Sequence, residues 1–98
     1  MALTHLAFCN LGSVVNAASL PITLSGSVVS EAITPTASNQ QSSASTRGFV
    51  RVATDTAVYV AFGANPDATT TTGRFYLPAG SVEWYAISVS DKVAVVTA

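Results

Sequence analysis

Charge is the property that this sequence has least of. Only 4 of its 98 residues are Lys or Arg and 5 are Asp or Glu, which is 9% of the chain. A typical soluble domain carries about 25% charged residues. A freely diffusing monomer needs surface charge to stay soluble and apart from its copies. So little charge favours a protein whose surface is covered by other polypeptide in a permanent assembly.

Other scarce features exclude further classes of protein. The single Cys9 cannot form an internal disulfide, so the fold does not depend on oxidation. A net charge of −1 without a cluster of Lys or Arg gives no electrostatic basis for binding nucleic acid. No stretch approaches the roughly 18–20 apolar residues that span a bilayer, and the N-terminus lacks the basic region of a signal peptide. We therefore expect neither a nucleic acid nor a membrane as a partner.

The pattern that is present is that of β-strands. β-branched and aromatic residues alternate with small or polar ones in the second half of the chain, and Asp, Gly, Asn and Pro mark the joins. Helical periodicity is nowhere convincing. Strands are expected at 49–54, 57–62, 74–77, 82–89 and 92–97, with shorter ones at 2–9, 20–24 and 28–34. The sequence therefore predicts an all-β fold, a single β-sandwich or jelly-roll-like barrel with an extended N-terminal arm.

The chain divides into three parts by composition, within one domain. Residues 1–34 form weak strands or an arm, residues 35–46 are almost all Ser, Thr, Ala, Asn and Gln and read as a polar linker or loop, and residues 47–98 form the sandwich body. Glu31 is the only charged residue before Arg47, which fits a buried arm and an uncharged but hydrated surface equally well. The predicted core is Val50, Val52, Val58, Val60, Phe62, Leu77, Trp84, Ile87, Val93 and Val95.

Residues that could carry chemistry are few. His5 and Cys9 could both bind a metal, but two ligands fall short of the four that a structural zinc site requires, so a strand histidine beside a buried thiol is the better interpretation. A Ser-His-Asp arrangement would have to recruit His5 from the far end of the chain. No phosphate-binding glycine loop or dinucleotide motif is present. We expect no catalytic, cofactor-binding or metal-binding residues, and no enzyme.

Acidic and aromatic residues have structural explanations as well. Asp residues are favoured in turns because the side chain bonds the local backbone, whereas a glycosidase would need two carboxylates facing each other across a cleft. Aromatic side chains on strands serve packing and interfaces more often than sugar or base stacking. The residues weighed in this way are the carboxylates Glu31, Asp55, Asp67, Glu83 and Asp91, and the aromatics Tyr59, Phe62, Phe75, Tyr76, Trp84 and Tyr85.

Several turn-and-strand motifs between Arg47 and Val96 carry a resemblance. They are Ser45-Thr46-Arg47-Gly48, Val58-Tyr59-Val60-Ala61-Phe62-Gly63 with Asn65-Pro66 and Ala68, Tyr76-Leu77-Pro78-Ala79-Gly80 with Glu83, and Asp91-Lys92-Val93-Ala94-Val95. This half of the chain resembles small structural proteins of tailed bacteriophages that are encoded near the capsid genes. A Gly often precedes the Asp-Lys pair in that group, whereas this chain has Ser90.

The resemblance implies a virion component without enzymatic activity, made in the host cytoplasm. Capsid decoration, in which a homo-oligomer binds the major capsid protein and cements the head, is the first expectation, and related decoration proteins imply a trimer. The alternatives are a neck or tail component, and a receptor- or glycan-binding module for which Trp84 or Tyr85 would lie exposed beside a groove. In the arm hypothesis, deleting residues 2–24 abolishes incorporation into particles but leaves the C-terminal half folded.

Overall fold

The computed structural model describes residues 3–12, 22–23 and 28–98, and within these residues it contains β-strands and no helix. Strands are favoured because β-branched and aromatic residues fit a pleated, half-buried surface. The strands are β1 (Thr4–Cys9), β2 (Leu11–Gly12), β3 (Ile22–Thr23), β4 (Val29–Ile33), β5 (Gln40–Gln41), β6 (Phe49–Thr54), β7 (Val58–Gly63), β8 (Phe75–Leu77), β9 (Val82–Ala86) and β10 (Lys92–Thr97).

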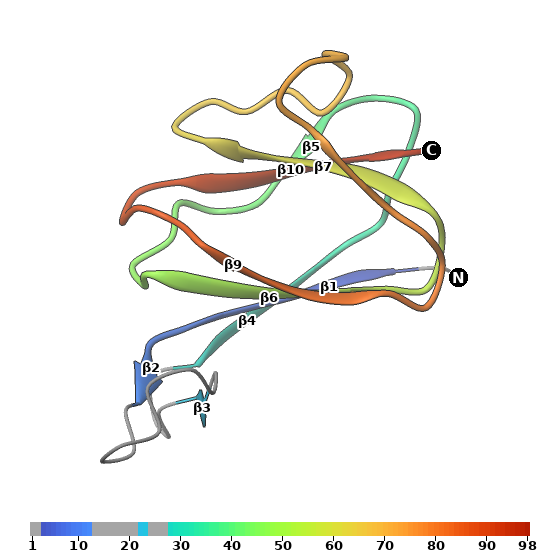
Figure 1. Cartoon of the computed structure of the whole chain (residues 1–98). Helices are drawn as coiled ribbons and strands as arrows, with labels where there is room; N and C mark the ends of the chain where they lie inside the picture. Colours follow the sequence, from blue (N-terminus) through green and yellow to red (C-terminus); the bar gives the residue numbers. More distant parts are fainter. Residues whose placement is uncertain (1–2, 13–21, 24–27) are drawn as a thin grey trace.

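Eight of these strands form two four-stranded antiparallel sheets. The first sheet has the order β4-β1-β6-β9 and the second the order β5-β10-β7-β8. The sheets stack face to face, while the short β2–β3 pair lies beyond one end of the stack (Figure 1). The predicted all-β fold with two packed sheets is therefore confirmed.

The core fills the space between the two sheets. Inward positions alternate with outward ones along β6, where Val50 and Val52 are fully buried and Arg51 and Ala53 are not. The buried cluster consists of Leu6, Phe8, Ile33, Val50, Val52, Val58, Val60, Leu77, Val93 and Val95. Seven of the predicted core residues are in this cluster, and Phe62 and Ile87 pack against it partly buried.

Trp84 was the wrong choice for the core. In the antiparallel register of β6 and β9, Trp84 lies opposite Arg51 and Tyr85 lies opposite Val50. Because directly opposed residues project to the same face, Trp84 shares the outer face with Arg51. Tyr85 instead packs against the core.

The sandwich is also larger than the predicted body at 47–98. β1 lies between β4 and β6 in the first sheet, with Leu6 opposite Glu31 on one side and Val52 on the other. Leu6, Phe8 and Ile33 supply part of the buried cluster. Residues 4–9 and 29–33 therefore belong to the sandwich and not to an arm, because their inward side chains complete its core. The remaining part of the predicted arm falls largely outside the described residues.

The polar stretch 35–46 is not a free linker. Gln40 and Gln41 pair with β10 as β5, and the backbone N–H groups of Ser42 and Ser45 donate to the carbonyls of Val93 and Asp91 at 2.8 and 2.7 Å. Backbone pairing needs no apolar side chain, and that is why a stretch without large hydrophobic residues is held at the edge of the second sheet.

Ser90 is the one described non-glycine residue with a positive φ, at 79°. The left-handed conformation costs an L-residue about 1–2 kcal/mol, and replacement by glycine removes this cost. Glycine also increases the conformational entropy of the unfolded chain, which offsets part of the stabilisation. We expect Ser90→Gly to raise the free energy of unfolding by about 0.5–1 kcal/mol in urea denaturation.

The matched control is Ser88→Gly in the same turn, where φ is not positive. This substitution adds unfolded-state entropy without relieving strain, so it should lower the free energy of unfolding. Equal changes for the two variants would show that the Ser90 conformation carries no strain.

Candidate functional site

His5 and Cys9 do not form a metal site. Both lie on β1, where a separation of four residues places them about 13 Å apart. The His5 side chain is 54% exposed, whereas Cys9 is buried. Among the described residues no group of three or more His, Cys, Asp or Glu side chains could hold a metal ion.

The carboxylates are dispersed and mostly bond to their local backbone. Asp67 accepts the backbone N–H of Thr69 at 2.9 Å and Asp91 accepts that of Ser88 at 3.0 Å, which confirms the turn role predicted for both. Hydrogen bonds from the hydroxyl and backbone of Thr69 lower the pKa of Asp67. These hydrogen bonds hold each carboxylate within its own turn. Asp67 and Asp91 therefore do not form a pair of carboxylates for acid–base catalysis.

The remaining acidic residues are also apart from one another. Asp55 lies 4.0 Å from the His5 imidazole in an exposed pair, which contributes little to stability. Glu31 accepts the backbone N–H of Ser43 at 3.2 Å and its hydroxyl at 3.1 Å. The Glu83 side chain makes no hydrogen bond or ion pair with any residue that the structure describes.

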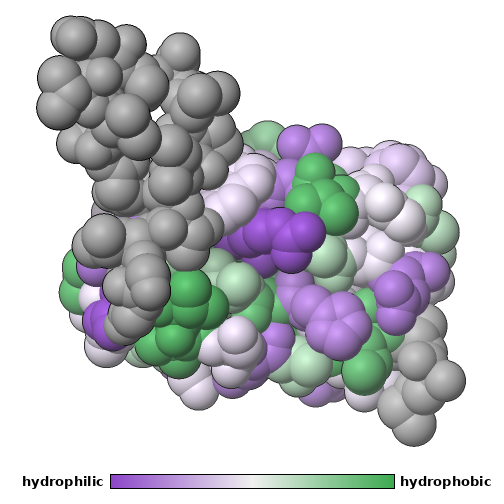
Figure 2. All heavy atoms as spheres, turned by 90° about the horizontal axis from the view of Figure 1, so that it is seen from below, coloured by the Kyte–Doolittle hydropathy of each residue, from purple (hydrophilic) through white to green (hydrophobic). Residues whose placement is uncertain are grey.

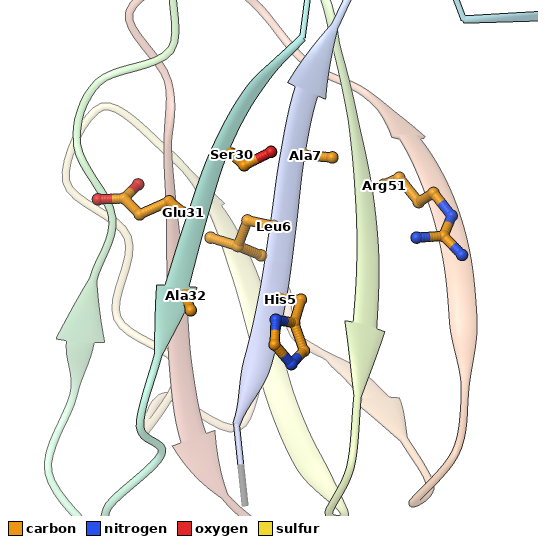
Figure 3. A pocket seen from close by; sticks show the side chains of 7 residues that line it. All are labelled: His5, Leu6, Ala7, Ser30, Glu31, Ala32 and Arg51. Atoms are coloured by element: carbon orange, nitrogen blue, oxygen red, sulfur yellow. The ribbon is translucent and has the colours of Figure 1, made fainter.

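A shallow hollow of about 360 Å³ lies on the outer face of the first sheet (Figure 3). The small side chains of Ala7, Ser30 and Ala32 leave this space, with His5 and Arg51 at its sides. Trp84 is not one of the residues that line it. Figure 2, which looks at this face, shows hydrophobic and hydrophilic side chains intermixed. The hollow is lined by Glu31 and Arg51, one residue of each sign, so its described lining has no concentrated charge that would select a particular ligand.

The second exposed feature is an aromatic edge, which we define as Phe62, Phe75 and Tyr85. The ring centroids are 4.6 Å apart for Phe62 and Tyr85, 5.2 Å for Phe75 and Tyr85, and 6.0 Å for Phe62 and Phe75. All three pairs are tilted, as aromatic side chains prefer. Phe75 nevertheless remains 50% exposed.

The topology explains why Phe75 is exposed. β8 and β9 are the last strands of their two sheets, so no further strand covers this side of the sandwich. Phe75 lies opposite Val60 and Tyr85 lies opposite Val50, which directs both rings inward at the open side. The aromatic edge closes the core here but leaves half of the Phe75 side chain to solvent.

Next to these rings runs the free backbone edge of β9. The N–H of Ile87 donates to Gly48 and the N–H of Thr54 donates to Ser81, so the hydrogen-bonded positions of β9 are the odd-numbered ones. In an antiparallel ladder the alternate residues direct their N–H and C=O groups away from the partner strand. Val82, Trp84 and Ala86 therefore present these groups at the outer edge, and no described residue bonds them.

Two ionisable side chains, Glu83 and Tyr85, lie on β9 at this edge. Burial and, to a smaller degree, the nearby Glu83 carboxylate raise the pKa of the Tyr85 hydroxyl. Tyr85 therefore stays protonated at neutral pH and can donate a hydrogen bond. Glu83 is the only charged residue within β9.

Two further aromatic residues, Tyr59 and Tyr76, lie on the opposite face of β7 and β8 from Phe62 and Phe75. Tyr59 and Tyr76 pack together with centroids 5.6 Å apart, and the Arg74 guanidinium lies 3.6 Å from the centre of the Tyr59 ring. This side of the sandwich suits contact with another polypeptide, since it combines the half-exposed Phe75 ring with the unpaired backbone groups of β9. The alternation of side chains predicts the positions of the rings, but only the strand order shows that β9 is an edge.

Comparison with protein-family models, curated proteins and solved structures gives no match to this chain. In the residues that the structure describes, no helix has the length and hydrophobicity required to cross a membrane. Any assignment of function therefore depends on the residues and their arrangement.

Proposed function

We propose that this protein is a non-enzymatic structural component of a tailed-phage particle, and specifically a decoration protein that binds the major capsid protein of the head as a homo-oligomer. The observation that carries the proposal is the combination of an unpaired strand edge beside the half-exposed Phe75 ring with only 9% charged residues. Exposed apolar groups on a surface poor in charge favour coverage by other polypeptide. The resemblance of residues 47–96 to phage structural proteins supplies the kind of particle.

We further infer that the sandwich is a jelly roll. That fold has eight strands, lettered B to I in chain order, in two sheets. One sheet has the strand order B-I-D-G and the other has the order C-H-E-F. β4 to β10 follow B to H in both sheets, and β1 occupies the place of the last strand, I. Two contacts support this inference: Leu3, just before β1, accepts the N–H of Asp55, and Ala98, just after β10, donates to Ala57. The start of β1 and the end of β10 therefore lie at the same turn, as the start of strand I and the end of strand H would. Jelly rolls serve many functions, so this inference concerns the fold alone.

Imaging of whole phage particles that carry this gene product tests the proposed function. We expect density for the sandwich at repeated positions on the head lattice, as an oligomer bound to the capsid shell. Density confined to the neck or tail would favour the runner-up, in which the same surfaces contact other virion proteins. Particles without this protein would contradict both. The glycan-binding alternative gains no support from the hollow, since Trp84 does not line it.

The arm hypothesis needs a different deletion from 2–24, because that deletion removes β1 from the middle of a sheet. Deleting residues 13–27 keeps β1 and β4 and leaves a four-residue connection, a common hairpin loop length. If this segment contacts neighbouring subunits, the variant should unfold at the same urea midpoint as the full chain but fail to enter particles. Normal incorporation would rule out the arm.

A further inference from the structure

We propose that two copies of this chain pair through β9 in an antiparallel, two-fold arrangement centred on Trp84, which joins their first sheets into one eight-stranded sheet. The inference rests on the proposed homo-oligomer and names the surface that forms it. A two-fold pair differs from the trimer that the phage resemblance implies, and the experiment below separates them.

β9 is the edge best suited to this pairing. β5 has two residues and β8 has three and is followed by Pro78, so both are too short to form an extended ladder. β4 has five residues, but its Glu31 carboxylate is already bonded to Ser43 beside it. β9 also has five residues, and its outer backbone groups have no partner among the described residues.

Backbone geometry restricts the possible registers. Only Val82, Trp84 and Ala86 direct their N–H and C=O groups outward, so each must face another of these residues in the second copy. Centring the pair on Trp84 places Trp84 opposite Trp84 and Val82 opposite Ala86. This register uses all the outward groups of β9 in both copies, whereas a shift to either side leaves some of them unpaired.

Charge selects the same register. An inward-directed charge on an edge strand normally prevents pairing, and Glu83 is such a residue. In a register centred on Glu83 the two carboxylates would face each other, which is destabilising. In the register centred on Trp84, Glu83 faces Tyr85 of the second copy instead. Tyr85 is protonated and can donate a hydrogen bond to that carboxylate.

The pairing also accounts for the exposed rings. Tyr85 belongs to the aromatic edge, and Phe75 beside it is 50% exposed. A second copy on β9 brings its own aromatic edge to the same seam, so both half-exposed phenylalanines lose solvent contact. Trp84 of each copy meets its counterpart on the outer face, where aromatic cross-strand pairs are favourable.

Measuring the mass of the full chain in solution, by light scattering or sedimentation, tests the proposal with edge variants. The wild-type protein should have twice the 10.0 kDa mass of one chain. Ala86→Pro removes an outward N–H that β6 does not use, so the variant should fold and have the mass of one chain. Ala86→Thr, which keeps this N–H, is the matched control and should retain the double mass.

A charge exchange at the centre tests the register. Trp84→Lys and Trp84→Glu should each be monomeric alone, because like charges meet at the two-fold axis. Mixed together they should form a heterodimer, since opposite charges then meet there. Formation of the dimer on mixing also shows that both variants are folded.

Three results would overturn the proposal. They are a wild-type protein with the mass of one chain, a wild-type protein with the mass of three chains, and a wild-type dimer whose Trp84 charge variants do not complement each other. A mass of one chain would also contradict the homo-oligomer of the proposed function, whereas the position of the protein on the head is decided separately by the particle images.

Discussion

Replacing Leu6 with alanine lowers the free energy of unfolding of the whole domain by about 2–5 kcal/mol. Leu6 is 1% exposed and lies on β1, which is paired on both sides in the first sheet. Its truncation leaves a cavity between the sheets that the surrounding strands can fill only in part. Small domains are stable by only about 5–15 kcal/mol, so this loss is large. Urea denaturation followed by the fluorescence of the single tryptophan measures it.

His5→Ala provides the control on the same strand. The His5 side chain points to the outer face and is 54% exposed, and its contact with Asp55 is weak. The free energy of unfolding should therefore change by less than about 0.5 kcal/mol. If Leu6→Ala has as little effect as His5→Ala, then β1 is not part of the cooperative fold and residues 1–34 behave as an arm.

Replacing Asn39 with alanine should release the loop at 64–73 and lower the free energy of unfolding by about 1–3 kcal/mol. The Asn39 side chain donates to the carbonyl of Pro66 at 3.0 Å and accepts the N–H of Ala68 at 2.9 Å. These bonds hold Ala68 over the outer face of the second sheet, where it is fully buried against Ala61, Ala94 and Val96. Without them a buried N–H loses its partner.

Limited proteolysis together with urea denaturation checks this prediction. The variant should be cleaved within 64–73 faster than the wild-type protein, since a loop that opens locally is a better protease substrate. Gln40→Ala is the matched control, because the Gln40 side chain bonds only the exposed hydroxyl of Thr36. Unchanged cleavage in Asn39→Ala would show that the apolar contacts of Ala68 hold the loop without the amide.

Alternation along single strands was readable from the sequence. Val50, Val52, Val58, Val60, Val93 and Val95 were predicted to lie inside and do so, because the two-residue period of a strand fixes which side chains share a face. The turn roles of Asp67 and Asp91 were equally local, since a carboxylate that bonds the backbone two or three residues away needs no tertiary contact.

Predictions that depended on partners across the fold were less complete. The segment at 35–46 has no apolar pattern, yet it is held by backbone bonds to β10, which is far along the chain. Residues 1–34 lack the dense pattern of the second half, yet β1 is a central strand of the first sheet. Trp84 and Tyr85 are both large and aromatic, and only the register with β6 decides which of them faces the core.

By itself the sequence determined the fold class, the position of most strands and the scarcity of charge, because these follow from composition and from a period of two along the chain. Only the tertiary structure decided that β1 lies within a sheet and that β9 lies at an edge beside the half-exposed Phe75 ring. The reason is that strand order is set by hydrogen bonds between residues distant in sequence, and no pattern within one strand records which neighbour it will have.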